Sequence, residues 1–202
     1  MNLDKTNIIK EHNKKYRLEH KDYDKEYYLK NKYKIKERKK KYHEKLKIKV
    51  FEHYGKKCEL CGQDKENFLT IDHIGGGGNK HRKKIGNEIY SWLKNNNFPK
   101  GFRTLCYNCN LTKKIKDKVK DKKGQEYRQN IKKKVLEHYG LKCNYCGNNQ
   151  IEYLTIDHIN GGGIEHRRKC GNSSFGVYLW IIRNNFPEIF QTLCYNCNCS
   201  KR

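Results

Sequence analysis

The sequence contains few acidic residues, few hydrophobic residues and almost no proline. Asp and Glu number 22 against 46 Lys and Arg, so the 202-residue chain carries a net charge of +24, and only 35% of its residues are hydrophobic. A charge this large attracts polyanions and says little about the fold. Nucleic acid is therefore the first candidate partner, and an anionic membrane surface is the second.

Long hydrophobic runs are also lacking. No apolar stretch approaches the roughly 20 residues that a membrane-spanning helix needs. The N-terminal segment MNLDKTNIIKEHNKKY has no apolar core of a secretory signal. We therefore expect an intracellular, cytoplasmic protein with no membrane partner. Thiols stay reduced in that compartment, so the 10 cysteines are expected to bind metal rather than to form disulfides.

An internal repeat divides the chain. The segments KVFEHYG and LTIDHIGGGG of the first copy return, 85 positions later, as KVLEHYG and LTIDHINGGG, and three residues are inserted after Asn172. Because the apolar fraction is too low for one large core, we expect small modules that need an additional staple. The predicted organisation is an arm at 1–48, a first module at 49–113, a basic linker at 114–133 and a second module at 134–202.

The arm and the linker are rich in lysine. The arm holds no Gly or Pro and recurring Tyr, so we predict a helix, either in contact with DNA or solvated with its tyrosines against the modules. The linker is predicted to be a shorter basic helix broken near Gly124.

Each module is predicted to be α+β. A short helix ends at Gly55 or Gly140, and a strand, FLTIDHI or YLTIDHI, runs into the glycine loop. Helices near 88–96 and 174–185 follow, with Trp92 and Trp180 expected in the core. A second strand, FRTLC or FQTLC, leads into a final helix that begins near Asn110 or Asn198.

Two Cys-x-x-Cys pairs bracket each module. Zinc takes four thiolates in a tetrahedron, and each Cys-x-x-Cys turn supplies two of them. The sequence therefore predicts two structural zinc ions, with redox thiols or disulfides as the alternative. The expected ligands are Cys58, Cys61, Cys106 and Cys109 for the first ion, and Cys143, Cys146, Cys194 and Cys197 for the second.

An Asp-His pair ends the first strand of each module, as Asp72-His73 and Asp157-His158. An imidazole can take a proton from water near neutral pH, and a carboxylate is a ligand for Mg²⁺. The glycines allow the strand to bend so that both side chains address one phosphate. The residue after the last cysteine, Asn110 or Asn198, is either a further part of this site or the N-cap of the final helix.

The order Cys-x-x-Cys, Asp-His, Cys-x-x-Cys-Asn resembles the zinc-bound HNH, or His-Me finger, endonucleases of phage, homing and restriction type. The resemblance covers both modules and implies a ββα-metal fold around one Mg²⁺ or Mn²⁺ ion in each. It implies that His73 and His158 are the general bases. It also implies that Asp72 with Asn110, and Asp157 with Asn198, bind the catalytic ion, and that cleavage leaves 5′-phosphate ends.

Several recurring residues have two interpretations. The family's middle Asn, which supports the base, falls at Asn87 and Asn172, but either could be an N-cap. The pairs His81-Arg82 and His166-Arg167 either contact phosphate or belong to a solvated polar loop. Asn160 of the second loop has Gly75 as its counterpart, which predicts unequal activity or a looser first loop.

These patterns predict a metal-dependent endonuclease that cuts double-stranded DNA as a monomer or a homodimer. Two complete sets of site residues in one chain would allow a monomer to cut both strands. The alternatives are a nickase with one active module and a non-catalytic DNA-binding protein that keeps the zinc fold as a scaffold. The recognition sequence, and the choice among restriction, homing and phage roles, do not follow from the chain alone.

Overall fold

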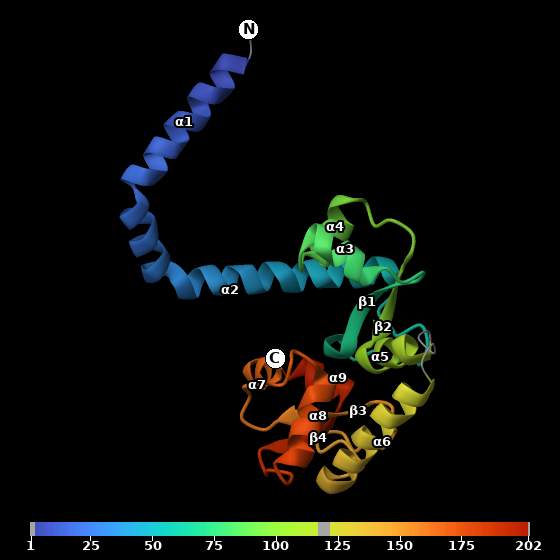
Figure 1. Cartoon of the computed structure of the whole chain (residues 1–202). Coiled ribbons are helices and arrows are strands. Elements are labelled where there is room, and N and C mark those ends of the chain that lie inside the picture. The colour runs from blue at the N-terminus through green and yellow to red at the C-terminus, as the bar shows by residue number, and fades with distance from the viewer. Residues whose placement is uncertain (1–2, 117–121, 202) are drawn as a thin grey trace.

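The computed structural model describes residues 3–116 and 122–201 (Figure 1). Helices surround two separate two-stranded antiparallel sheets, which confirms the α+β class. The N-terminal helices extend away from the two modules, which lie next to each other (Figure 1).

The arm is helical, as predicted. Helix α1 covers Leu3–Glu19 and helix α2 covers Lys21–Tyr54, with His20 between them stacked on Tyr16 at 4.0 Å between ring centroids. Because α2 continues past residue 48, the predicted module boundary falls inside one helix. The three buried residues of α2 lie near its C-terminal end and include Val50 and Phe51. The arm is therefore a solvated extension of a helix that is anchored in the first core.

The first module is built on strands β1, Leu69–His73, and β2, Phe102–Cys106. Their register sets Asp72 opposite Arg103 and His73 opposite Phe102. The short 3₁₀ helix η1, Glu66–Phe68, precedes β1, and helices α3, Gly78–Ile85, and α4, Ile89–Asn95, connect the strands. Helix α5, Tyr107–Lys116, follows β2 directly.

The second module repeats this order. Helix α6, Lys122–Tyr139, begins just before Gly124, and residues 117–121 of the linker lie outside the described residues, so the predicted break near that glycine stays a prediction. Strand β3, Leu154–His158, pairs with β4, Phe190–Cys194. Helices α7, Gly163–Lys169, and α8, Ser174–Arg183, connect them, and α9, Tyr195–Ser200, closes the module.

Helices α3 and α7 follow the glycines, where a solvated polar loop was one of the two interpretations of the sequence. Each starts at a glycine in the left-handed conformation, Gly77 with φ 81° and Gly162 with φ 81°. Neither helix has a buried residue. Apolar periodicity is the main sequence signal for a helix, and it is missing here.

Each module has a small core that includes buried cysteines of its Cys-x-x-Cys pairs. The first core joins buried residues of α2, β1, α4 and β2 to Cys58, Cys106 and Cys109. Trp92 is partly buried against this core, and Trp180 is partly buried against a second cluster of the second module formed by Val135, Val177, Ile181 and Phe190, as predicted. Cores of this size gain from a metal staple because metal-binding energy adds to folding energy.

The two modules contact each other through equivalent residues. The backbone N–H of Asn108 donates to Asn196 Oδ1 at 2.9 Å, and the N–H of Asn196 donates to Asn108 Oδ1 at 2.8 Å. Both asparagines are buried. Phe68 of the first module packs into the core of the second, and the rings of Tyr107 and Tyr195 meet edge-to-face at 6.3 Å between centroids. The repeat therefore forms an intramolecular pair with reciprocal contacts.

Candidate functional site

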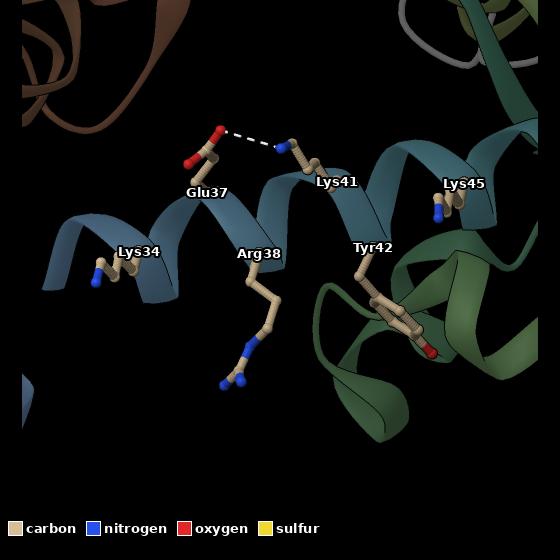
Figure 2. Close-up of a pocket in the computed structure, with 6 residues that line it drawn as sticks. All are labelled: Lys34, Glu37, Arg38, Lys41, Tyr42 and Lys45. Atoms are coloured by element: carbon tan, nitrogen blue, oxygen red, sulfur yellow. Dashed lines mark ion pairs between the residues drawn. The ribbon is translucent and has the colours of Figure 1, made fainter. Parts of the chain in front are cut away.

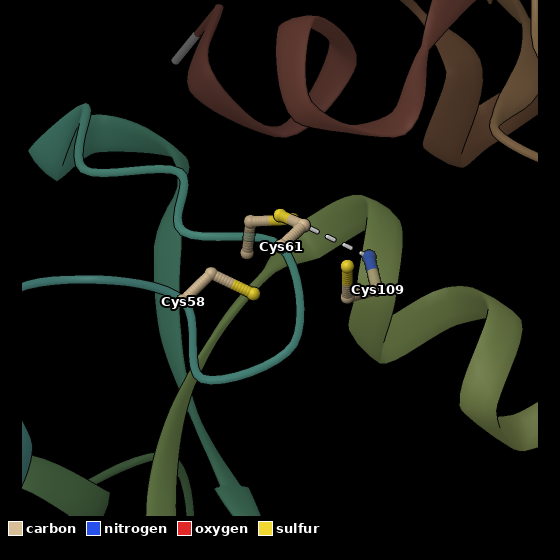
Figure 3. A group of neighbouring side chains, drawn as sticks. Cys58, Cys61 and Cys109 are labelled. Carbon is tan, nitrogen blue, oxygen red and sulfur yellow. Dashed lines mark hydrogen bonds between the residues drawn. The ribbon is translucent and has the colours of Figure 1, made fainter.

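Four cysteines meet in each module, as the spacing predicted. In both groups the sulfurs lie within 4.8 Å of one another, so each group could hold a metal ion such as zinc. Figure 3 shows the first group, with Cys58 and Cys61 on the loop after α2 and Cys109 on α5. The sulfur of Cys61 is 3.7 Å from that of Cys106. The second group consists of Cys143, Cys146, Cys194 and Cys197.

The first and last thiols of each group have different environments. Burial raises the pKa of Cys143, but hydrogen bonds from the backbone of Cys194 and Cys146 outweigh it and lower that pKa to about 7. Burial raises the pKa of Cys197, and hydrogen bonds with neighbouring thiols raise it further. Four neutral thiols gain little by meeting in a small core, whereas a divalent cation would stabilise them as thiolates.

The histidine at the end of each first strand is held by a second histidine. His73 Nε2 lies 2.8 Å from His81 Nδ1, and His158 Nε2 lies 2.7 Å from His166 Nδ1. His81 packs edge-to-face on Trp92 at 4.2 Å between centroids. The rings of His81 and His166 thus contact the strand-end histidines. Whether the pairs His81-Arg82 and His166-Arg167 contact phosphate stays a prediction.

Both strand-end imidazoles favour the neutral form. Burial lowers the pKa of His73, and the nearby His81 lowers it further against the opposing effect of Asp72. Burial and His166 lower the pKa of His158 in the same way. A neutral imidazole near pH 7 is able to accept a proton.

The glycine loop fits closely around this ring. A Cβ atom added at Gly78 would lie 3.2 Å from His73 Nδ1, and one at Gly163 would lie 3.0 Å from His158 Nδ1. A Cβ at Gly75 would meet nothing within 4 Å. A Cβ at the Gly75 position, as in Asn160, therefore meets no steric obstacle, whereas a side chain at Gly78 or Gly163 would require the imidazole to shift by a few tenths of an ångström.

The carboxylate beside the histidine is bound by a lysine that sequence reasoning missed. Lys113 Nζ donates to Asp72 Oδ2 at 2.7 Å and to the backbone oxygen of His73 at 3.1 Å. In the second module Lys201 Nζ donates to Asp157 Oδ2 at 2.8 Å. Both lysines stand three residues after the predicted Asn ligand, and this recurrence in the repeat was the signal that could have revealed them.

Asn110 and Asn198 are not helix caps. Helices α5 and α9 begin at Tyr107 and Tyr195, and Cys194 is the N-cap of α9, with its side chain accepting from the Cys197 N–H. Asn110 Oδ1 is buried and has no hydrogen-bond partner among the described residues. The amide oxygen is thus free to accept a hydrogen bond or to bind a cation.

Most of the residues predicted for the active site of the first module line one pocket of about 570 Å³. Asp72, His73, His81, Arg82 and Asn110 all line it. Asn87 also lines it, but it is not the N-cap of α4, which is Glu88. Asn172 likewise precedes the N-cap of α8, Ser173, and adopts φ 57°. The support of the base by Asn87 or Asn172 stays a prediction, because the imidazoles are hydrogen-bonded to His81 and His166.

Positive side chains follow one face of the arm. Lys34, Arg38, Lys41 and Lys45, here named the arm cluster, recur at helical spacing and line a shallow pocket together with Tyr42. Figure 2 shows Arg38 and Tyr42 pointing to the same side of α2, with Glu37 paired to Lys41. The exposed tyrosines of the arm include Tyr33, which is 81% exposed, and they are solvated rather than packed on the modules.

None of the described helices is long and apolar enough to cross a membrane. No family model matches the chain, and neither curated proteins nor solved structures gave a match.

Proposed function

We propose that the chain is a metal-dependent DNA endonuclease with two HNH-type sites, one in each module. The observation that carries the proposal is the duplicated cluster at the strand end. In each module it combines a neutral imidazole fixed by a second histidine with an adjacent carboxylate, beside a Cys₄ group. A scaffold protein has no need of this arrangement twice.

The imidazole is suited to act as general base. When His73 Nε2–H donates to His81 Nδ1, the other ring nitrogen, Nδ1, is free of a proton and faces the glycine loop that lines the pocket. This nitrogen would accept the proton of the attacking water. His158 and His166 would do the same in the second module. His81 and His166 would thus fix both the orientation and the tautomer of the base.

The residues beside the base fit a hard divalent cation. Asp72 supplies a carboxylate, and the buried, unpartnered Oδ1 of Asn110 supplies an amide oxygen in the same pocket. Oxygen donors of this kind suit Mg²⁺ or Mn²⁺. When bound, such an ion stabilises negative charge on the phosphate and on the leaving oxygen. Asp157 and Asn198 are the corresponding residues of the second module.

The basic residues around each site are suited to hold DNA. Lys113, fixed by Asp72 and by the strand-end carbonyls, would add a positive charge near the scissile phosphate. Arg82 lines the same pocket. The arm cluster would contact phosphates outside the cleavage site, which predicts affinity that depends steeply on salt.

A non-catalytic DNA-binding protein is the second candidate, and one observation favours it. Lys113 Nζ already satisfies Asp72 at 2.7 Å, as Lys201 Nζ satisfies Asp157 at 2.8 Å. Carboxylates neutralised by lysines would be stable in a protein that uses the Cys₄ fold only as a scaffold.

Incubation of supercoiled plasmid with the protein and Mg²⁺ or Mn²⁺ distinguishes these functions. The wild type is compared with His73→Ala, His158→Ala and the double variant, and with His43→Ala on the exposed arm as a matched control. We expect linear DNA from the wild type and the control, open circles from each single variant, and no cleavage by the double variant. Intact plasmid with the wild type across both metals and several DNA substrates would support the scaffold. Open circles from the wild type, abolished by only one single variant, would indicate a nickase.

A further inference from the structure

The two carboxylates differ in the residue that stands across the sheet from them. Arg103 is opposite Asp72, and its Nε donates to Asp72 Oδ2 at 3.2 Å. The equivalent residue in the second module is neutral: Gln191 Nε2 donates to Asp157 Oδ2 at 3.0 Å. The lysine contacts are alike in both modules, so the extra guanidinium charge is the main difference at the carboxylate.

This charge lies in a place where water screens it poorly. The side chains of Arg103 and Asp72 are only 15% and 11% exposed. A fixed positive charge beside a carboxylate repels a divalent cation that approaches the same oxygen, and partial burial strengthens the repulsion. Glu59 also pairs with Arg103, at 3.0 Å, but its side chain is 55% exposed and offsets the repulsion only in part.

A second charge difference acts in the same direction. Lys80 lines the pocket of the first module, and the repeat has Glu165 at the equivalent position of the second. Glu165 pairs with Lys169 at 3.1 Å on the exposed surface of α7, so its effect is smaller than that of Arg103.

We propose that the site at Asp157 binds a divalent cation more tightly than the site at Asp72, and that Arg103 is the residue responsible. The inference rests on the proposed function in that both sites are taken to be cation sites. When the metal is limiting, the second module is loaded first, so one strand of the DNA is cut before the other and nicked DNA accumulates.

The test measures the affinity of the full-length, zinc-loaded chain for Mn²⁺ in the absence of DNA. The concentration of free Mn²⁺ is monitored by electron paramagnetic resonance during the titration. Asp157→Asn leaves only the first site to report, and Asp72→Asn leaves only the second. We expect the first site to bind about tenfold more weakly, since tenfold needs only about 1.4 kcal/mol of differential repulsion. In these backgrounds Arg103→Gln tightens the first site and Gln191→Arg weakens the second. Lys56→Gln removes an exposed charge of the first module and leaves its affinity unchanged.

The outcomes separate this inference from the proposed function. Equal affinities, an unchanged first site in Arg103→Gln, or no Mn²⁺ binding at either site would overturn the inference. Unequal affinities that respond to both substitutions would support it even if no DNA substrate is cut, in which case only the nuclease proposal fails.

Discussion

Replacement of His81 distinguishes the role of positioning the general base from the role of the base itself, His73. His81 contributes one hydrogen bond to the His73 ring, at 2.8 Å, and it is supported by Trp92. A hydrogen bond of this kind contributes about 0.5–1.5 kcal/mol. The loss of a general base costs about 10²- to 10⁴-fold in rate. We therefore expect His81→Leu to slow cleavage by about tenfold or less, and His73→Ala to slow it by at least ten times more.

The assay is single-turnover nicking of supercoiled plasmid in a His158→Ala background, so that only the first site is observed. His81→Asn is the conservative variant, because its amide oxygen can accept from His73 Nε2 near the position of the original ring nitrogen. We expect it to recover most of the rate, with DNA affinity and zinc content unchanged in both variants. If His81→Leu is as slow as His73→Ala, or His81→Asn is no faster than His81→Leu, the positioning role is refuted.

Four further predictions address the glycine loop, the interface between modules, the cysteines and the arm. Gly78→Ala should slow nicking in the same assay, because its Cβ would lie 3.2 Å from His73 Nδ1, whereas Gly75→Ala, with open space around it, should not. Asn196→Ala should lower the free energy of unfolding in urea by about 1–3 kcal/mol, since the buried N–H of Asn108 is left without its acceptor; an unchanged midpoint and slope would contradict the reciprocal contact. Removal of metal by a chelator should abolish near-ultraviolet circular dichroism, because binding energy supports both cores; full retention of the signal would exclude a structural ion. Replacement of the arm cluster by glutamine should reduce the slope of log affinity against log salt by about 0.9 for each phosphate that the arm no longer neutralises, measured by DNA titration; a slope equal to that of the wild type would show that the arm does not bind DNA.

Local pattern was enough to predict most elements of the fold. The repeat, the Cys-x-x-Cys spacing and the strand LTIDH define two equivalent modules, each with a Cys₄ group, because tight turns and alternating strands are determined by near neighbours. The helical arm follows from its lysine-rich composition without Gly or Pro. Prediction missed α3 and α7, since a helix without buried residues gives a weak signal in the sequence.

Contacts between distant residues were decided only by the tertiary structure. The sequence could nominate His73 and Asp72, but not the pairing of His73 with His81, because the turn of the glycine loop determines where α3 presents its ring. Antiparallel register brings Arg103 to Asp72, and the packing of α5 brings Lys113 there. The reciprocal bonds of Asn108 and Asn196 join residues 88 positions apart, and they depend on how two folded surfaces fit together. The sequence was thus enough to identify the residue types that could perform chemistry. Their contact partners, and the difference in charge between the two sites, could be identified only from the folded structure.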